Sequence, residues 1–376
     1  MANWRHMMHP SRYVLSALAG LALLGSFQGA KAEGTVTEDT SPIVQVLKCT
    51  TNCGKWSPAQ RIGGMNLYYP HERYQTHAEG FVELSYSIGT NGRVQDLVVI
   101  QQQGPQIFVD RTVETVSAWP FRPALQDGLP VEQKNLRRAF YFYESDVSHA
   151  HKPSLDAYNT ANQLAASGKV SDAIAILLKA KENPETNFYE RCTIAYLLAL
   201  DYMKLNDYPN ALRQIRDATR SSGWFLLPNS NDPHFSRDVR KQAVRLRFAL
   251  EAHEQQYGEA LAWFDALKKE KTIEDDDPEV KVADAIKAAM AKPDPIAIPA
   301  TVSSDDAKWT YAPFRHNFGF DHIKGKLSTF TLRCDQQSIS SAITEEAHWT
   351  VPQSFTHCFI EVLGTPGTTF QFLEAE

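Results

Sequence analysis

Residues 80–94 read GFVELSYSIGTNGRV, and this stretch decides the fold of the region around it. Every second residue from Val82 to Ile88 is apolar and the residues between them are polar, which is the period of a strand with one buried face. Asn91-Gly92 then supplies the positive φ angles that a tight hairpin turn needs. The stretch therefore predicts a strand and a turn, and Val94 with residues 97–100 forms the returning strand.

The following residues extend this hairpin into a small domain. After a break at Gly104-Pro105, valines recur at helical spacing up to Trp119, and Pro120 ends the helix. The run from Asn135 to Tyr143 is rich in strand-forming residues and predicts a last strand. Strand, hairpin, strand, helix and strand together indicate a small α+β domain.

Five motifs in this region occur in the order and spacing of one known family. They are Tyr69-Pro70, the strand Gly80–Ile88, Asn91-Gly92-Arg93-Val94, Trp119-Pro120-Phe121-Arg122-Pro123-Ala124 and Gly128-Leu129-Pro130-Val131. Roughly residues 60 to 145 thereby resemble the carboxy-terminal domain of TonB. In that family a Y-P pair, a G-x-V-x-V-x-F-x-I strand, a D/N-G-x-V turn, a W-x-F-x-P-A helix end and a G-x-P-V turn follow one another. The resemblance covers about a quarter of the chain.

The resemblance implies a partner and a place where it binds. The TonB domain pairs an edge strand with an extended peptide of an outer-membrane receptor, so main-chain hydrogen bonds supply the affinity. The edge implied here is the strand from Asn135 to Tyr143. Its partner-contacting residues are Asn135, Leu136, Arg137, Arg138, Ala139, Phe140 and Tyr141. The expected partners are proteins or peptides, among them TonB-dependent outer-membrane receptors.

The motif residues also have structural explanations. Trp119 and Phe121 are expected to fill the space between the helix and the sheet, because a large aromatic side chain at a helix end covers much apolar area. Pro123 and Pro130 shape the turn into the last strand, and Gly128 permits it.

The chain departs from a TonB that transduces the proton-motive force. Such a transducer keeps an amino-terminal membrane helix and a long Pro-rich spacer. Here the lead-in to the domain is about 30 residues long without a Pro-rich tract, and over 230 residues follow the domain.

The amino terminus predicts export. Arg5 and Arg12 precede an apolar run at residues 13–27, and Ala30-Lys31-Ala32 places small residues where a signal peptidase cleaves. The run of about 15 residues is shorter than the ~20 that span a bilayer as a helix. We expect a signal peptide at residues 1–32, a mature chain that begins near Glu33, and a periplasmic location. The alternative is a retained inner-membrane anchor.

The five cysteines of an exported chain predict disulfides. Cys49 and Cys53 are expected to close a small loop, and Cys334 to bridge Cys358, which leaves Cys192 as a buried thiol in a helical pattern. The C-x-x-x-C spacing of the first pair argues against a redox-active site, which uses C-x-x-C.

No pattern in the sequence indicates catalysis or a cofactor. A phosphate-binding glycine loop, a G-x-S-x-G elbow and an H-E-x-x-H motif are all absent. His149 and His151 have no further ligands at zinc spacing, and the acidic run at residues 274–277 lacks the alternating ligands of a calcium loop. A net charge of −6 without a basic stripe argues against nucleic acid as a partner. We expect no enzyme activity, no metal and no cofactor.

The middle third has the pattern of paired helices. Ala173, Ala211 and Ala260 each follow a turn near the start of a helix, at intervals of 38 and 49 residues. The segment resembles degenerate tetratricopeptide repeats, whose period is 34 residues. The alanines allow helices to approach closely, and a concave face of such a stack binds peptides or proteins. Tyr196, Tyr202 and Trp263 lie either on that face or in the core.

Short strand-like runs separated by turns occupy the carboxy-terminal segment and predict a small β-sandwich. Trp309, Tyr311 and Trp349 are either core residues or a platform for a sugar. The fold class is therefore multidomain α+β. The expected divisions are a signal peptide at 1–32, a lead-in at 33–59, the TonB-like domain at 60–146, a helical repeat domain at 153–292 and a β-sandwich at 300–376.

These features favour a periplasmic adaptor of TonB-dependent outer-membrane transport, which binds partner peptides by strand pairing and by its helical-repeat surface. One alternative is a membrane-anchored energy transducer of the TonB type. Another is a cell-envelope module that binds a glycan.

Overall fold

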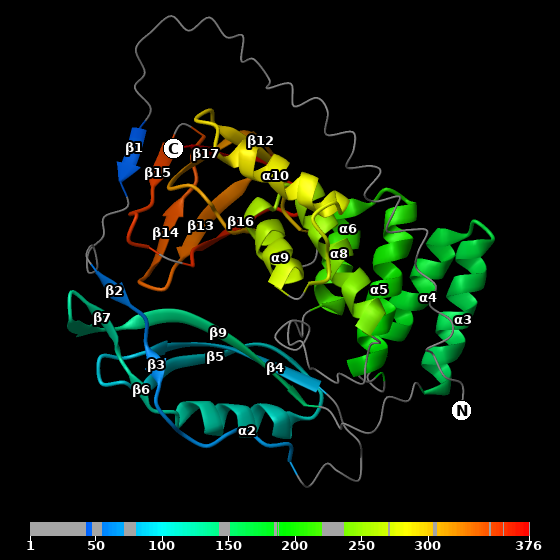
Figure 1. Ribbon diagram of the computed structural model, residues 1–376, viewed down its shortest axis with the longest axis horizontal. Helices are drawn as coiled ribbons and strands as arrows, with labels where there is room; N and C mark the ends of the chain where they lie inside the picture. Colours follow the sequence, from blue (N-terminus) through cyan, green and yellow to red (C-terminus); the bar gives the residue numbers. More distant parts are fainter. Residues whose placement is uncertain are drawn as a thin grey trace, which may run out of the picture.

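The structure is a computed structural model, and it describes most of the chain. The described residues are 43–46, 55–70, 80–142, 151–183, 186, 188–219, 237–269, 271–303, 307–345, 347–355 and 357–375. The expected signal peptide at 1–32, the expected Cys49–Cys53 bridge, Tyr143 and His149 lie outside them. Figure 1 shows three regions along the chain: a sheet with one helix, a group of helices, and a carboxy-terminal β domain.

The first region has the strand and helix order that the sequence predicts. A central strand β4 (Gly80–Ile88) pairs antiparallel with β5 (Val94–Gln103) on one side and with β9 (Gln133–Phe142) on the other. Helix α2 (Gln106–Ser117) packs against β4 and β5 (Figure 1). The sheet order is therefore β5-β4-β9, with a strand edge on each side of the described sheet.

The hairpin between β4 and β5 depends on one glycine. Gly92 has a φ of +73°, and a Cβ atom there would lie 2.1 Å from the carbonyl oxygen of Phe121. The Gly92 N–H donates to the Gly89 carbonyl at 2.9 Å, which closes the turn. Only glycine combines this backbone conformation with so close an approach.

Trp119 and Phe121 are both buried, and they belong to the core cluster between α2 and the sheet, as the sequence predicts. The indole Nε1 of Trp119 donates to the carbonyl of Met65 at 2.8 Å, and the Arg61 guanidinium lies 3.9 Å from the ring centre. The segment before the sheet therefore closes this core. Short strands complete the region: β2 (Trp56–Ser57), β3 (Gln60–Arg61), β6 (Phe121–Arg122), β7 (Ala124–Gln126) and β8 (Leu129–Val131).

The second region is a series of helices in which each described helix contacts the next. They are α3 (Lys152–Ala166), α4 (Val170–Glu182), α5 (Phe188–Lys204), α6 (Tyr208–Ala218), α8 (Arg237–His253), α9 (Tyr257–Lys269) and α10 (Pro278–Met290). Ala173, Ala211 and Ala260 are fully buried, which is the close-packing role expected for them. The tetratricopeptide type of the repeat stays a prediction.

The aromatic residues of the helical region lie mostly in its core rather than on a binding face. Tyr196 and Trp263 are buried, and Tyr202 is partly buried against the same core clusters. Cys192 is buried in α5, as expected for this thiol.

The third region contains two sheets that share one core. Its strands are β10 (Ile296–Thr301), β11 (Lys308–Tyr311), β12 (Asn317–Lys324), β13 (Leu327–Arg333), β14 (Ser338–Ala342), β15 (Ala347–Thr350), β16 (Phe359–Gly364) and β17 (Thr369–Ala375). One sheet has the order β1-β15-β12-β17-β10, in which β1 is the earlier strand Ile43–Val46, and the other has the order β11-β16-β13-β14. Phe320, Phe330, Trp349 and Phe372 from both sheets meet in the core. The Cys334–Cys358 disulfide is present, as the sequence predicts.

The lead-in contributes a strand that the sequence does not reveal. Strand β1 (Ile43–Val46) runs parallel to β15 at the edge of the carboxy-terminal sheet, with Ile43 opposite Ala347. A four-residue strand has too few residues for a periodic pattern, and its hydrogen-bond partner lies about 300 positions away in the chain. Residues 43–46 of the expected lead-in are therefore paired with the last domain.

Buried Arg315 joins the end of α10 to the β domain, and buried Glu374 holds the backbone of Arg315 in place. The Arg315 guanidinium donates to the carbonyls of Met290, Lys292 and Asp294, which follow the helix or end it. The Glu374 carboxylate accepts hydrogen bonds from the backbone N–H of Phe314 at 2.9 Å and of Arg315 at 3.2 Å. Burial raises the pKa of Glu374 to about 7, although these hydrogen bonds act in the opposite direction.

Candidate partner-binding edge

Strand β9 contains the whole set of residues that the resemblance assigns to partner binding. Asn135 to Tyr141 lie within β9, and within the described sheet β4 is the strand that pairs with it. The pairing is regular from Gly80 opposite Phe142 to Tyr86 opposite Leu136. The edge therefore offers seven consecutive residues, 136–142, in regular strand geometry.

Side chains on both sides of β9 explain why this segment is a strand. Leu136 and Phe140 are partly buried against the core of the sheet, and Phe142 is buried. Phe142 stacks on Phe108 of α2 with ring centres 4.2 Å apart. At the start of the strand, the buried Gln133 side chain accepts a hydrogen bond from the backbone N–H of Ala59 at 2.7 Å. From Leu136 to Phe142 the strand is thus held by the core, and Gln133 ties its start to the lead-in.

The first residues of β9 already bind another part of the chain. The Lys134 N–H donates to the carbonyl of Asp335 at 2.8 Å, and the Asn135 amide donates to the carbonyl of Cys334 at 2.8 Å. The Ser338 hydroxyl in turn donates to the Asn135 side-chain oxygen at 3.0 Å. The disulfide-bonded turn of the carboxy-terminal domain therefore covers the beginning of the edge. Nothing in the sequence pattern indicated this contact.

Two exposed arginines mark the centre of the edge. The Arg137 Nε lies 3.5 Å from the Glu83 carboxylate, and its guanidinium lies 5.3 Å from the ring centre of Phe359. The Arg138 guanidinium lies 5.7 Å from the ring centre of Trp119. A strand that pairs with β9 would pass two positive charges at this point.

The opposite edge of the same sheet is less regular. Strand β5 has two register irregularities against β4, and Asp96 within it has a φ of +51°. Bulges of this kind twist an edge strand and disfavour the addition of another strand. Val98 and Ile100 are nonetheless exposed on β5. Of the two edges, β9 is the better template for a partner strand.

Other kinds of site find little support in the described residues. They contain no cluster of three or more His, Cys, Asp or Glu side chains positioned to bind a metal ion. The His151 Nδ1 lies 3.2 Å from the buried Glu190 carboxylate, and the rest of the histidine side chain is exposed. In the described part of the chain, every helix is too short or too polar to cross a membrane.

Comparison with known proteins identifies the first region. Residues 65–143 match the family described as the Gram-negative bacterial TonB protein C-terminal. The solution structure of the TonB C-terminal domain from Pseudomonas aeruginosa is 21% identical, over 24% of this chain and 91% of that chain, with a TM-score of 0.22. The TonB2 protein from Vibrio anguillarum is 23% identical, over 29% of this chain and 96% of that chain, with a TM-score of 0.19.

No curated protein matches the chain. The matched family is a transport-related domain without catalytic activity, and the match ends at residue 143. Residues 65–143 therefore match the TonB C-terminal family within a longer chain.

Proposed function

We propose that this protein is an exported periplasmic adaptor of TonB-dependent outer-membrane transport, which binds an extended segment of a partner protein on β9. The observation that carries the proposal is the regular run from Leu136 to Phe142 at the edge of the TonB-type sheet. A peptide that adds to such an edge gains main-chain hydrogen bonds along its length, and the side chains beside it set the preference.

The charges beside the edge favour an acidic partner segment. Arg137 and Arg138 are exposed at its centre, and Glu83 is the acidic group near Arg137. A carboxylate on the partner strand would form charge-assisted hydrogen bonds with these guanidinium groups. The partner class is therefore an outer-membrane receptor with an extended acidic segment that reaches the periplasm.

The other regions complete the adaptor in this proposal. The helical repeat domain, residues 153–292, offers a second surface for a partner protein, and the β-sandwich at 300–376 holds the start of β9 through Asp335. The TonB-like domain occupies 60–146, and removal of residues 1–32 releases the chain into the periplasm. Amino-terminal sequencing of the protein from cell fractions tests the last point: Glu33 at the terminus in the periplasmic fraction is expected, and Met1 retained in the inner membrane would favour the energy transducer.

Site-specific photocross-linking in cells tests the edge. A photoreactive residue replaces Arg137 on β9 in one variant and Gln101 on β5 in a control variant. Both positions are exposed on edge strands of one sheet. The two variants therefore probe opposite edges of the same domain. We expect adducts from position 137 to an outer-membrane receptor, with the cross-linked peptide in its periplasmic extended segment.

Two results would refute the proposed function. The first is an absence of receptor adducts from position 137 while the variant chain remains folded and exported. The second is an equal yield of receptor adducts from position 101, because this would place the partner on β5 or make the contact non-specific.

A further inference from the structure

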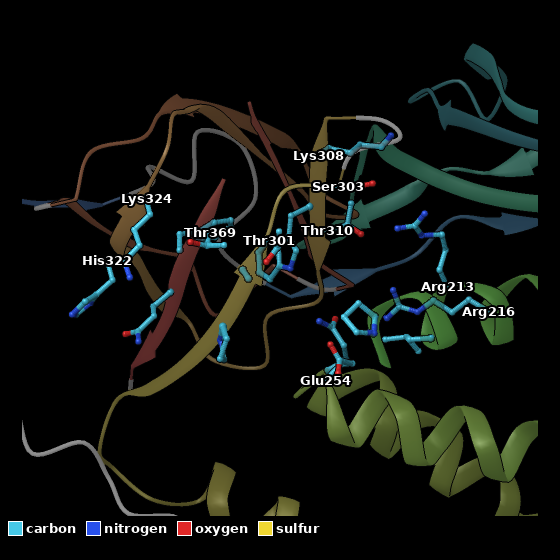
Figure 2. Close-up of a pocket in the computed structure, with 18 of the residues that line it drawn as sticks. Arg213, Arg216, Glu254, Thr301, Ser303, Lys308, Thr310, His322, Lys324 and Thr369 are labelled. Carbon is cyan, nitrogen blue, oxygen red and sulfur yellow. The ribbon is translucent and has the colours of Figure 1, made fainter. Parts of the chain in front are cut away.

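A cavity of about 840 Å³ lies between the helical region and the carboxy-terminal β domain. Helix α6 and the turn between α8 and α9 form one wall, and strands β10, β11, β12 and β17 form the other (Figure 2). Its volume falls within the range of about 300–1,000 Å³ that is typical of small-ligand sites. No residue of β9 lines it, so a ligand here is independent of the proposed strand pairing.

The lining of the cavity is more positive than negative. Its cationic side chains are Arg213, Arg216, Lys308 and Lys324, and its carboxylates are Asp217 and Glu254. Asp217 is already ion-paired with Lys181 at 2.6 Å, and Lys308 lies 3.8 Å from Glu361. In Figure 2, Lys324 and His322 stand at one end of the cavity, and Arg213 and Arg216 at the other. Positive charge therefore lies at both ends.

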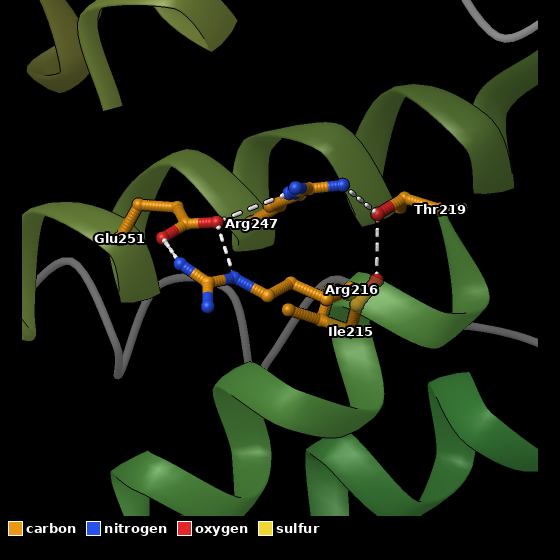
Figure 3. Close-up of polar contacts among 5 residues, drawn as sticks. All are labelled: Ile215, Arg216, Thr219, Arg247 and Glu251. Atoms are coloured by element: carbon orange, nitrogen blue, oxygen red, sulfur yellow. Dashed lines mark hydrogen bonds and ion pairs between the residues drawn. The ribbon is translucent and has the colours of Figure 1, made fainter. Parts of the chain in front are cut away.

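The α6 end of the cavity is built on a buried cluster of two arginines around one glutamate (Figure 3). The Glu251 carboxylate is fully buried and accepts two hydrogen bonds from Arg216, from Nε at 2.9 Å and from Nη2 at 2.5 Å. Arg247 shares the same carboxylate through its Nε at 3.2 Å, and its Nη1 donates to the Thr219 hydroxyl at 2.9 Å. That hydroxyl donates to the Ile215 carbonyl at 2.6 Å. Two guanidinium groups thus share the Glu251 carboxylate, and Glu254 and Glu259 lie close enough to act on Arg216 as well.

This cluster presents an oriented donor to the cavity. The Nη1 atom of Arg216 has no hydrogen-bond partner among the described residues, and Arg216 lines the cavity. Burial and the adjacent Arg216 charge lower the pKa of Arg247, whereas Glu251, Glu259 and Glu254 outweigh burial and raise the pKa of Arg216. An anion beside Arg216 would meet a charged guanidinium that Glu251 already holds in place, with no need to reorient it.

The opposite wall carries hydroxyl groups and one indole ring. Thr301, Thr310 and Thr369 are exposed and line the cavity, and the half-buried Trp309 lies among them. Trp309 and Tyr311 stack with ring centres 5.4 Å apart, which fixes the indole in place. Of the three aromatic residues considered for a sugar platform, Tyr311 and Trp349 are core residues and Trp309 reaches the cavity.

The sheet edge beside the cavity argues against a peptide strand as the ligand. Strand β10 is the edge strand of its sheet and pairs with β17 in the described residues. Pro299 lies in the middle of β10 and also lines the cavity. A proline has no N–H to donate, so it interrupts the row of donors that an added strand requires. Hydroxyl and cationic side chains, rather than backbone, are what this wall offers.

We propose that this cavity binds an acidic oligosaccharide, whose carboxylates meet the α6 arginines at one end and Lys324 at the other. The ligand hydroxyls exchange hydrogen bonds with the threonine side chains, and Trp309 packs against a sugar ring. Because positive charge lies at both ends, the cavity favours a chain of several sugars with more than one carboxylate. A single small anion could reach only one end.

Isothermal titration calorimetry on the full-length chain tests the proposal with three probes. They are hexagalacturonate, the neutral hexasaccharide maltohexaose, and a hexaglutamate peptide. One variant combines Arg213→Gln with Lys324→Gln, both exposed residues outside the buried cluster. A matched control combines Arg111→Gln on α2 with Lys281→Gln on α10, which removes the same charge away from the cavity.

We expect hexagalacturonate to bind, and the cavity double variant to weaken it by at least about tenfold, because two charged contacts are lost. The control double variant should bind as the parent chain does, and maltohexaose should bind at least about tenfold more weakly than hexagalacturonate. The proposal is overturned by an absence of hexagalacturonate binding, by equal weakening in the control variant, or by hexaglutamate that binds as tightly as the sugar and is equally sensitive to the cavity variant.

Discussion

Two fully buried tryptophans show how differently the TonB-type domain and the carboxy-terminal β domain are held together. Trp119 donates its indole N–H to the Met65 carbonyl, which belongs to the segment before the sheet. The Trp349 N–H has no partner in the described residues, and the ring lies among phenylalanines, with Phe330 at 4.9 Å and Phe318 at 5.7 Å between ring centres. The first core is closed by a hydrogen bond to a flanking segment, and the second by aromatic packing.

This difference matters for the proposed function. A domain that must present an edge strand to a partner keeps that strand in place through its core and its lead-in, as β9 does through Phe142 and Gln133. The carboxy-terminal domain instead provides the contact to Asn135 and one wall of the cavity. We therefore expect damage to one core to leave the other folded.

The largest effect is expected from replacing either tryptophan by alanine. Trp119→Ala and Trp349→Ala should each lower the free energy of unfolding of their own domain by about 3–5 kcal/mol, because each leaves a large cavity. Hydrogen exchange measured by mass spectrometry resolves the two domains. Faster exchange is expected in residues 80–142 for the first variant and in residues 296–375 for the second. Exchange that rises equally in both domains would show that they form one cooperative unit.

A smaller effect is a pH dependence of the stability of the carboxy-terminal β domain. Burial raises the pKa of Glu374 in the folded β domain to about 7, above its ordinary value of 4.5. The folded state therefore binds a proton that the unfolded state has lost between these values, and the stability of this domain falls as the pH rises from about 4.5 to 7. A shift of this size corresponds to about 3 kcal/mol.

Urea denaturation of the parent chain and of Glu374→Gln at pH 5 and pH 8 measures the contribution of Glu374 to the free energy of unfolding. Glutamine keeps an acceptor for the Phe314 and Arg315 N–H groups and carries no charge. The variant should gain stability relative to the parent at pH 8 and gain little at pH 5. The titration of all other groups is common to both proteins and cancels in the comparison. An equal difference at both pH values would contradict the assignment to Glu374.

The parts of the fold that the sequence predicts are those with partners nearby in the chain. The β4–β5 hairpin follows from an alternation and an Asn91-Gly92 turn, and α2 from valines at helical spacing. The Cys334–Cys358 bridge closes a separation of 24 residues. The β1–β15 pair and the Asn135–Cys334 contact join residues far apart in the chain, the second over 199 positions, and no local pattern encodes them.

The two candidate sites, the β9 edge and the cavity, differ in the same way in how far the sequence predicts them. The order of the family motifs predicts the edge strand that contains Asn135, because each motif is a short stretch of consecutive residues. The cavity between α6 and the β domain depends on the docking of two regions. Arg216 appears in the sequence as one arginine on an amphipathic helix, and its role depends on Glu251, which lies 35 positions away.

A third prediction contrasts the two indole N–H groups without opening a large cavity. Trp119→Phe loses the hydrogen bond to Met65 and leaves that carbonyl without its donor, whereas Trp349→Phe removes a donor that has no partner in the described residues. We expect Trp119→Phe to cost about 1 kcal/mol more than Trp349→Phe, since the two share the same loss of ring volume. Chemical denaturation of both variants gives the difference directly, and a larger cost for Trp349→Phe would reverse the comparison of the two cores.

The smallest effect concerns the point where the two domains touch. Asn135 has a φ of +58° and exchanges side-chain hydrogen bonds with Cys334 and Ser338. Asn135→Gly keeps this backbone conformation without strain and removes both bonds, so a loss below about 1 kcal/mol is expected. In hydrogen-exchange measurements, the Lys134 amide should exchange faster while residues 136–142 keep their protection, because β4 and the core hold them. Loss of protection along the whole strand would mean that the carboxy-terminal domain, and not the sheet, maintains the edge. The edge would then be ready for a partner only while the two domains stay in contact.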